Sequence, residues 1–585
     1  MSSLPKGFFD TAPDASSASL SGREHVIQGF FDKPEEPPTK RPKVYQEPEE
    51  EMMEEEERGA EEEEEEEEEM DQAEAMDKML DEAEPVEVWD QAQLKRAVVS
   101  LIRKTATNQE MRIKHPDEPA RFLDSEVELF EEINKMQALA TSPELYTEFV
   151  KLNGVAKMTE LLDHENKDIA LAVVDLANEL TDPEALIEAA SEEGSRALVD
   201  ALVENSFLEL LIKNLQRLDE SEDDQKQGVY STLGIVENLS EVQPGALDAM
   251  CEKSDLIPWL LKRLTVKGID GNKLYASEIL SIVCQSSDGN KKRVAGGEGI
   301  DKLLALVAPW KKKDPKDSEE AELISNLFNT ICSTLMITEN QVALVEGEGI
   351  ELMVIMLQAR KFAARCALRV LDFAMMRQTS ACERFVKAMG LKTLFPAFMR
   401  PSSVWQTKSP EGKVGVREDE EHVVSIIATL LLRLSGDAHA RTVGKFVENN
   451  FEKLDRLVEL HEKYHKQVSA AVAREEDEEE EEDESEEGKQ ERQYLLRLDR
   501  GLFTLQHIDT TLAYLIAEAI PAIEGRIKTL LHQSDVSIAE VVTVMEEFQT
   551  NIGDDKDGTS DPLKMKEVAG DLILFLKDYA AQPEQ

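Results

Sequence analysis

The chain has 585 residues, with 66 Lys and Arg against 121 Asp and Glu, which gives a formal net charge of -55. Much of this charge is local, since residues 1–86 carry -21 and residues 475–487 carry -12, leaving -22 for the other 486 residues. A protein that binds the phosphate backbone needs the opposite sign over its contact surface. The composition therefore excludes direct nucleic-acid binding as the main activity.

Both acidic runs contain few aromatic residues, so they cannot bury enough apolar surface to offset chain entropy. We expect residues 1–86 to form a disordered acidic tail and residues 474–490 a disordered loop. The N-terminus lacks a charged-then-apolar signal peptide, and no apolar run approaches the roughly eighteen residues of a membrane helix. These features predict a soluble, intracellular protein with no membrane association.

One short stretch of the tail is basic. Lys40, Arg41 and Lys43 lie in PPTKRPKVY, residues 37–45, where flanking prolines favour an extended, exposed chain. An import receptor reads a cluster of this kind, although a chance basic patch in a tail is the alternative. We interpret the cluster as a nuclear-localisation signal and expect the protein in the nucleus.

From about residue 90 onward the sequence predicts one helix after another, in repeated units. The clearest unit is 153–182, where we expect Gly154 to end a helix, a short apolar helix to run to Leu162, and a longer one to reach Leu180. Such breaks recur about every 41 to 52 residues, at Gly154, Ser206, Ser254, Gly299, Gly349 and Gly390. This spacing predicts an all-α, right-handed superhelical solenoid of the armadillo or HEAT type.

The same patterns divide the chain into four parts. We expect the acidic tail at 1–86, an N-terminal helical cap at 87–152, armadillo-like repeats at 153–436, and a C-terminal helical region at 437–585 that contains the acidic loop.

Several segments resemble the β-catenin-like family of nuclear armadillo proteins. The resemblance begins at NQEMRIKHPDEPARFLDSEVEL, residues 108–129, continues through AVVDLANELTD and GIVENLSE to YLLRLDRGLFTLQHI, and covers the chain from about residue 90 to the end. It implies a non-catalytic scaffold, without a cofactor, that joins the spliceosome through the Prp-nineteen-type complex. It also implies that the scaffold binds basic nuclear-localisation segments of partners such as a Myb-repeat splicing factor; a homodimer stays possible.

Four residues are candidates for binding such a basic segment. Asp175 and Glu179 are four residues apart on one helix face, and Glu237 and Asn238 hold a similar place in the next unit. Carboxylates pair with Lys and Arg, and an Asn amide can hold a peptide backbone. The alternative is that these are solvated surface charges. The pattern departs from import adaptors, because Asp175 and Gly234 stand where that family has Trp.

A second motif suggests a metal. HEKYH, residues 461–465, places His461 and His465 on one helix face beside Glu462, as in zinc proteases. The surrounding positions favour a solvated helix face and a coincidental match, and no third ligand follows; these positions are Lys463, Tyr464, Lys466 and Gln467. We therefore expect no metal site.

Cysteine and glycine patterns add no chemistry. The five cysteines form no C-x-x-C pair and are expected to be buried core thiols; they are Cys251, Cys284, Cys332, Cys366 and Cys382. AGGEG at 295–299 lacks the Lys-Ser/Thr of a nucleotide-binding loop. The leading function is thus a splicing scaffold, followed by an acidic, histone-chaperone-like binder of basic proteins, and last by a zinc hydrolase.

Overall fold

The computed structural model describes residues 89–183, 192–400, 414–475, 486–552 and 565–581. Within these ranges the regular elements are α-helices and short 3-10 turns, with no strand, so the predicted all-α class is confirmed. The described residues fall into two compact units that meet in sequence at residues 243 and 244. The acidic tail with its basic cluster, and residues 476–485 of the acidic loop, lie outside the described residues.

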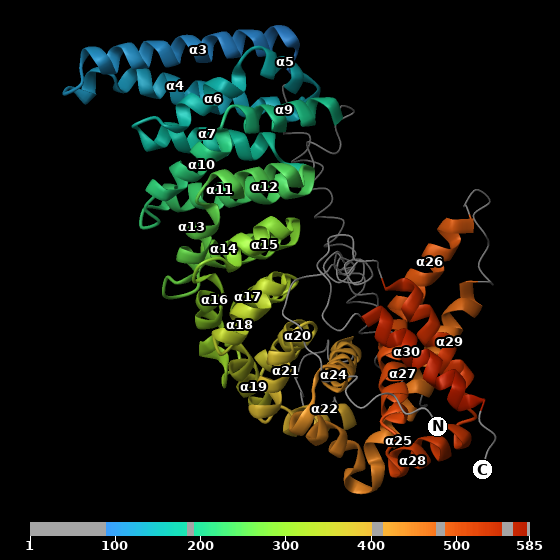
Figure 1. Ribbon diagram of the computed structural model, residues 1–585. Helices are drawn as coiled ribbons and strands as arrows, with labels where there is room; N and C mark the ends of the chain where they lie inside the picture. Colours follow the sequence, from blue (N-terminus) through green and yellow to red (C-terminus); the bar gives the residue numbers. More distant parts are fainter. Residues whose placement is uncertain (1–88, 184–191, 401–413, 476–485, 553–564, 582–585) are drawn as a thin grey trace, which may run out of the picture. The chain divides into compact units, whose positions relative to one another are not determined.

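The first unit, residues 89–243, consists of helices in successive layers (Figure 1). Short helix α6 packs on α10, and longer helix α7 packs on α11, so equivalent helices of two repeats stack. The elements are α3 (Gln91–Lys114), η1 (Pro119–Arg121), α4 (Leu123–Lys135), η2 (Met136–Thr141), η3 (Pro143–Leu145), α5 (Tyr146–Lys151), α6 (Gly154–Leu162), α7 (Lys167–Leu180), α9 (Glu192–Glu204), α10 (Phe207–Arg217) and α11 (Asp223–Val242).

Helices α3 and α4 cover the end of this stack. The side chain of Asp90 caps α3 by accepting a hydrogen bond of 2.6 Å from the backbone N–H of Gln93. Leu94, Val98 and Leu101 bury one face of α3, and α4 packs on both α3 and α7. The pair therefore closes the apolar end that the first repeat would otherwise expose.

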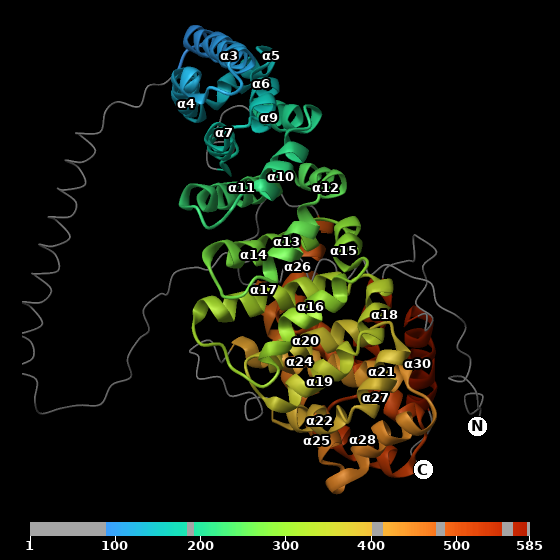
Figure 2. The same ribbon diagram turned by 90° about the vertical axis from the view of Figure 1, so that its left-hand side faces the viewer.

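The second unit, from residue 244 onward, contains further repeats, followed in the chain by a C-terminal helical cluster coloured orange to red in Figure 2. Its elements are α12 (Pro244–Lys253), α13 (Leu256–Leu264), α14 (Gly271–Ser286), α15 (Asp288–Ala295), α16 (Gly299–Val307), η4 (Ala308–Trp310), α17 (Ser318–Thr334), α18 (Thr338–Glu346), α19 (Gly349–Ala359), α20 (Ala363–Met375), α21 (Thr379–Lys387), α22 (Leu391–Met399), α24 (Val414–Arg433), α25 (Gly436–Glu475), α26 (Glu486–Asp499), α27 (Leu502–Ala517), α28 (Pro521–Gln533), α29 (Ile538–Asn551) and α30 (Met565–Ala580).

Each repeat of the second unit contains three helices, as in armadillo proteins. The long helices α14, α17, α20 and α24 pack one on the next, and each also contacts a short helix of its own repeat, namely α13, α16, α19 or α22. A third short helix precedes each pair, and these also contact their equivalents, α12 on α15 and α18 on α21. The predicted armadillo class is confirmed by this regular pairing.

All six predicted breaks lie at the start of the short helix of a repeat. Gly154 begins α6 rather than ending a helix, and the left-handed residue is Asn153 before it, at φ 59°. Glycine is needed for close approach, since a Cβ on Gly154 would lie 2.0 Å from the Phe149 ring and one on Gly390 would lie 2.3 Å from the Phe385 ring. At both positions, the absence of a side chain leaves room for the aromatic ring of the residue five positions earlier.

Helix α27 forms the centre of the C-terminal cluster, where α24, α25, α28, α29 and α30 contact it. Helix α25 is interrupted by non-helical backbone from Glu448 to Phe451. None of the described helices combines the length and apolar character that crossing a membrane requires.

Four of the five cysteines are buried, as predicted, and Cys366 is half-buried. Burial raises the pKa of the Cys332 thiol to about 11 and that of Cys251 and Cys382 to about 12. These thiols are therefore protonated near neutral pH and belong to the core.

Candidate functional site

Asp175 lies on α7 where this helix faces α11. The Ser231 hydroxyl donates a hydrogen bond of 2.9 Å to Asp175 Oδ1, and the Asp175 side chain is half-buried. Burial raises the pKa of Asp175, and the bond from Ser231 offsets part of that effect. Asp175 therefore ties the two helices together while part of its carboxylate still faces outward.

The other three predicted residues lie near the C-terminal ends of the same two helices. Glu179 is exposed one turn beyond Asp175, and Glu237 and Asn238 are half-buried on α11. Asn238 Nδ2 lies 3.5 Å from the Asn178 carbonyl oxygen and 3.4 Å from Thr181 Oγ1. This amide, expected to hold a ligand backbone, thus also contacts α7 of its own chain.

Beside Asp175 the surface is hollowed into an open pocket of about 490 Å³, between α4, α7 and α11. Asp175 lies in its wall, whereas Glu179, Glu237 and Asn238 do not. The charged residues of the wall are all acidic: Glu126, Asp168, Asp175 and Asp224. The structure therefore brings one predicted residue together with three acids that the sequence analysis did not select.

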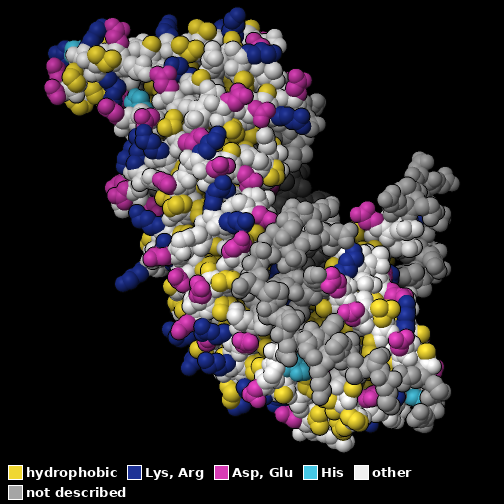
Figure 3. All heavy atoms as spheres, in the orientation of Figure 1, with side chains coloured by type: hydrophobic (Ala, Val, Ile, Leu, Met, Phe, Trp, Pro, Cys, Tyr) yellow, Lys and Arg dark blue, Asp and Glu magenta, His cyan; other side chains and the backbone are white. Residues whose placement is uncertain are grey.

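The residues that α4 contributes to the pocket are apolar except for Glu126. Leu123, Val127 and Phe130 line it and remain exposed, although they are large hydrophobic residues. Figure 3 shows hydrophobic side chains over the outer end of α3 and α4, with acidic side chains beside them. The spacing i, i+4, i+7 in LDSEVELF marks this face, but it is overlooked when a helix is assumed to have only one apolar side.

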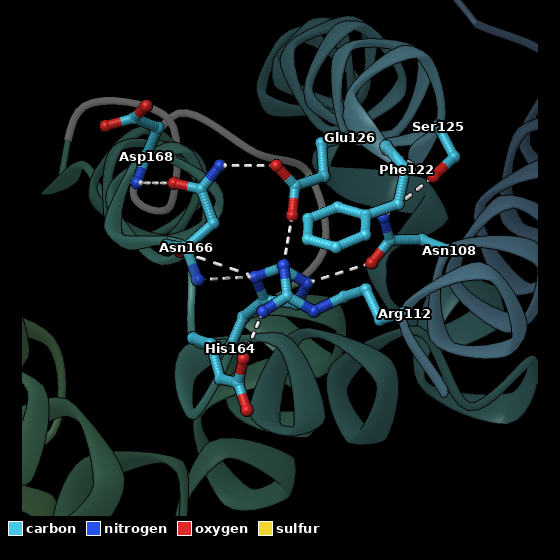
Figure 4. A network of polar contacts seen from close by, with 9 residues as sticks. Asn108, Arg112, Phe122, Ser125, Glu126, His164, Asn166 and Asp168 are labelled. Carbon is cyan, nitrogen blue, oxygen red and sulfur yellow. Dashed lines mark hydrogen bonds and ion pairs between the residues drawn. The ribbon is translucent and has the colours of Figure 1, made fainter. Parts of the chain in front are cut away.

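An ion-pair network fixes α3 and α4 against the start of α7 (Figure 4). Arg112 of α3 pairs with Glu126 and Glu165, and its guanidinium lies 4.7 Å from the centre of the Phe122 ring. Asn166 Nδ2 donates a 3.0 Å hydrogen bond to the other oxygen of Glu126. Glu126 is thus satisfied within the fold, which leaves the remaining acids of the pocket for a ligand.

His164 belongs to the same network in its neutral form. The backbone N–H of Asn166 donates to His164 Nδ1 at 3.0 Å, so we assign the proton to Nε2, which lies 3.0 Å from Asn108 Oδ1. Asn108 Nδ2 in turn donates to Ser125 Oγ at 3.0 Å. Burial lowers the pKa of His164, in agreement with this assignment. The network gives the pocket a rigid frame.

The environment of HEKYH corrects one prediction. Lys463, Lys466 and Gln467 are exposed as expected, but His461 and Tyr464 are fully buried. A solvated face was therefore the wrong reading of these two positions, because α25 packs on α27 and the sequence gives no sign of that contact.

The buried histidine has a specific partner within the fold. His461 Nδ1 lies 2.6 Å from Asp509 Oδ1 of α27, and the Tyr464 hydroxyl donates to Glu420 at 2.9 Å. Burial opposes the charge of His461, but the hydrogen bond to Asp509 and the negative charges of Asp509, Glu540 and Glu462 together outweigh it and raise the pKa of His461. No group of three or more His, Cys, Asp or Glu side chains in the described residues is arranged to hold a metal ion. The contact between His461 and Asp509 therefore joins α25 to α27 within the fold.

Comparison with known proteins places the chain. The sequence profile of the catenin-beta-like family, described as Arm-motif containing and nuclear, matches residues 70–546. The chain belongs to this family. It is 39% identical to human "Beta-catenin-like protein 1" over 497 residues, which cover 83% of this chain and 86% of the human protein. It is 32% identical to the fission yeast "Beta-catenin-like protein 1 homolog", over 79% of each chain.

The family resemblance predicted from the sequence is confirmed, and the catenin-beta-like profile is one of repeat proteins rather than of an enzyme class. Among solved structures, an engineered protein gives a TM-score of 0.44 at 15% identity, covering 76% of this chain and 95% of its own, and a designed armadillo repeat protein gives 0.33 at 13% identity, covering 46% and 99%. These scores are too low to bear on the fold, whose class follows from the helix contacts.

Proposed function

We propose that the chain is a non-catalytic nuclear scaffold of pre-mRNA splicing that binds basic, nuclear-localisation-like segments of its partners. The observation that carries this proposal is the pocket of α4, α7 and α11, whose only charged wall residues are acidic. Carboxylates on a rigid frame suit Lys and Arg side chains of a segment laid across them.

The exposed acids at this surface are available to a ligand. Asp168 and Asp224 are exposed in the pocket wall, and no ion pair to either is found in the described parts of the chain. Glu179 is exposed one turn beyond Asp175 on α7. Because Asp175 bonds to Ser231 and Glu237 is half-buried, the three exposed acids are the better positions for a charge reversal.

The splicing context rests on the resemblance to β-catenin-like proteins. That resemblance implies the Prp-nineteen-type complex and its Myb-repeat splicing factor as partners. The family profile, described as nuclear, supports a nuclear protein. Entry through an import receptor would use Lys40, Arg41 and Lys43, which lie outside the described residues. Self-association into a homodimer belongs to the same set of expectations.

Affinity purification from nuclear extract tests the proposal. The full chain should retain splicing proteins that carry basic segments, and the variant Asp168→Lys, Glu179→Lys, Asp224→Lys should lose them. A matched control reverses three exposed acids of the same unit that neither line the pocket nor lie on α7 or α11, namely Glu131, Glu144 and Glu193. Equal recovery by all three proteins would overturn the proposal.

The second candidate is an acidic binder of histone-like proteins, and the two acidic runs favour it because they supply -33 of the net charge of -55. The two functions separate cleanly. Histone binding that requires the acidic runs and is unaffected by the three reversals would favour this second function.

A further inference from the structure

Helix α4 has two apolar faces, and only one of them enters the core. Leu129 and Ile133 are fully buried, whereas Leu123, Val127 and Phe130 are exposed to 55%, 49% and 38%. Large side chains that form a continuous exposed stripe commonly mark an interaction surface. The exposed stripe also forms a wall of the acidic pocket, so apolar and acidic contacts are available in one place.

The position of this stripe is fixed by the fold. Glu126, between Leu123 and Val127 in sequence, is held by Arg112 and Asn166, which join α4 to α3 and to the start of α7. A rigid wall loses little entropy when a ligand binds. The pocket volume of about 490 Å³ also lies in the range of known ligand pockets, roughly 300–1,000 Å³.

The charges around the stripe select one kind of occupant. Asp168, Asp175 and Asp224 line the same pocket as the stripe, and no Lys or Arg is among the described residues that line it. A second copy of this chain would bring another strongly acidic protein against these acids, whereas a basic segment would gain from them. The ligand must therefore carry both an apolar side chain and cations.

We propose that the α4 stripe is an anchor site, which takes a large apolar or aromatic side chain lying beside Lys and Arg residues in a partner segment. The inference rests on the proposed function, because it names which basic segments the groove prefers. Cations alone would bind weakly and with strong salt dependence, and the anchor would add contacts that salt does not screen.

Two peptides of equal charge distinguish the contribution of the apolar anchor to the affinity from that of the cations. The first is PPTKRPKVY, the sequence of residues 37–45, in which Val44 and Tyr45 follow three cations. The second replaces Val44 and Tyr45 by Ser. Each is titrated into the full chain by fluorescence anisotropy. Any competition from the chain's own copy of this segment would lower both apparent affinities by the same factor, so the ratio of affinities for one protein is the readout.

The protein variants alter exposed side chains, so folding should be preserved. Val127→Ser with Phe130→Ser removes the centre of the stripe, and Leu123→Ser is an independent second variant. The control is Val99→Ser on α3, since Val99 is 57% exposed in the same unit but does not line the pocket. Circular dichroism melting checks that each variant is folded.

The unaltered chain should bind PPTKRPKVY about tenfold more tightly than the Ser peptide. The ratio should fall to about one in the Val127, Phe130 variant, fall partway in Leu123→Ser, and stay at about ten in Val99→Ser. A ratio of about one for the unaltered chain, or a ratio that the stripe variants leave unchanged, would overturn the anchor site.

Three further outcomes are distinguishable. Both peptides could bind equally, with a salt dependence, and lose binding on reversal of Asp168, Glu179 and Asp224. That result would contradict the anchor site and still support the proposed function. No binding of either peptide would remove both. A dimer in sedimentation that dissociates in the Val127, Phe130 variant would assign the stripe to a second copy and overturn the proposal.

Discussion

The ring of Phe149 lies directly against the backbone of Gly154, so that a Cβ on Gly154 would be 2.0 Å from Phe149 Cε2. Phe385 and Gly390 stand in the same relationship five residues apart in a later repeat. In both repeats the aromatic ring therefore occupies the space that a side chain at the glycine position would need, at the start of the short helix. This contact explains why Gly154 and Gly390 are glycines although the left-handed backbone belongs to the residue before each of them, Asn153 and Met389.

Gly154→Ala should destabilise the first unit by about 1–3 kcal/mol, because the added methyl group overlaps a buried ring. Gly444→Ala serves as the control, since a Cβ there meets nothing within 4 Å. Chemical denaturation of the three proteins measures the free energies of unfolding. If Phe149→Leu partly restores the stability of Gly154→Ala, the ring is the cause of the loss. A free energy of unfolding for Gly154→Ala equal to that of the parent would contradict this packing.

His461→Ala should lower the free energy of unfolding by about 2–4 kcal/mol, because it leaves the buried Asp509 carboxylate without its 2.6 Å partner. His465→Ala, at a half-buried position, should cost less than about 1 kcal/mol. Thermal and chemical melts compare the two variants. Elemental analysis should find no stoichiometric zinc in either. One zinc per chain in the parent that is lost in both variants would restore the metalloprotease reading.

Lys40→Ala, Arg41→Ala and Lys43→Ala together should reduce nuclear accumulation of a fluorescent fusion, since these residues form the basic cluster of an acidic tail. Entry with a bound partner can hide the effect in the full chain. A fusion of residues 1–86 alone, with and without the three substitutions, provides the comparison. Nuclear signal that is equal with and without the substitutions in both fusions would show that the cluster is not an import signal.

Binding of a basic peptide should weaken as the pH falls into the range where the pocket carboxylates take up protons, and the first part of this change should come from Asp175. Burial raises the pKa of Asp175, so it takes up a proton at a higher pH than an exposed Asp, whose pKa is about 4, and then no longer attracts a cation. Asp175→Asn should bind more weakly at pH 7 and show a shallower pH dependence.

The raised pKa of Asp175 also determines how its contribution to folding stability changes with pH. A raised pKa means that the folded chain binds this proton more tightly than the unfolded chain, so the associated stability is lost as the pH rises through that pKa. Asp175→Asn removes the charge and keeps an acceptor for Ser231, and it should therefore be at least as stable as the parent at pH 7. Identical pH profiles of binding for the two proteins would contradict the role of Asp175.

The repeat architecture was predictable because each break has a local cause. Gly154, Ser206 and Gly349 all mark helix starts that can be read from periodicity and a small residue. That Asp175 and Glu179 lie on one face of a helix was predictable, because their four-residue spacing alone requires it. These inferences need only contacts within one repeat.

The remaining features depend on contacts between distant segments. His461 is buried because Asp509, 48 residues later, packs on it, and its neighbours Glu462 and Lys463 are exposed and give no sign of this. The pocket wall forms because α4 packs on α7, which in turn packs on α11, and the sequence around Val127 and Phe130 does not reveal these contacts. Periodicity identifies an apolar face but does not say what covers it.

The central claim is that exposed acids in the α4, α7 and α11 pocket, and Glu179 beside it on α7, bind basic segments. Calorimetric titration of PPTKRPKVY into the full chain at two ionic strengths tests it most directly. Exposed ion pairs contribute roughly 0.2–1 kcal/mol each, so reversing Asp168, Glu179 and Asp224 to Lys should weaken binding about tenfold or more. Reversing Glu131, Glu144 and Glu193 should change it less than about twofold, and the parent's affinity should fall as salt rises. Equal affinities for the parent and the pocket variant, or an equal loss in the control, would contradict the claim.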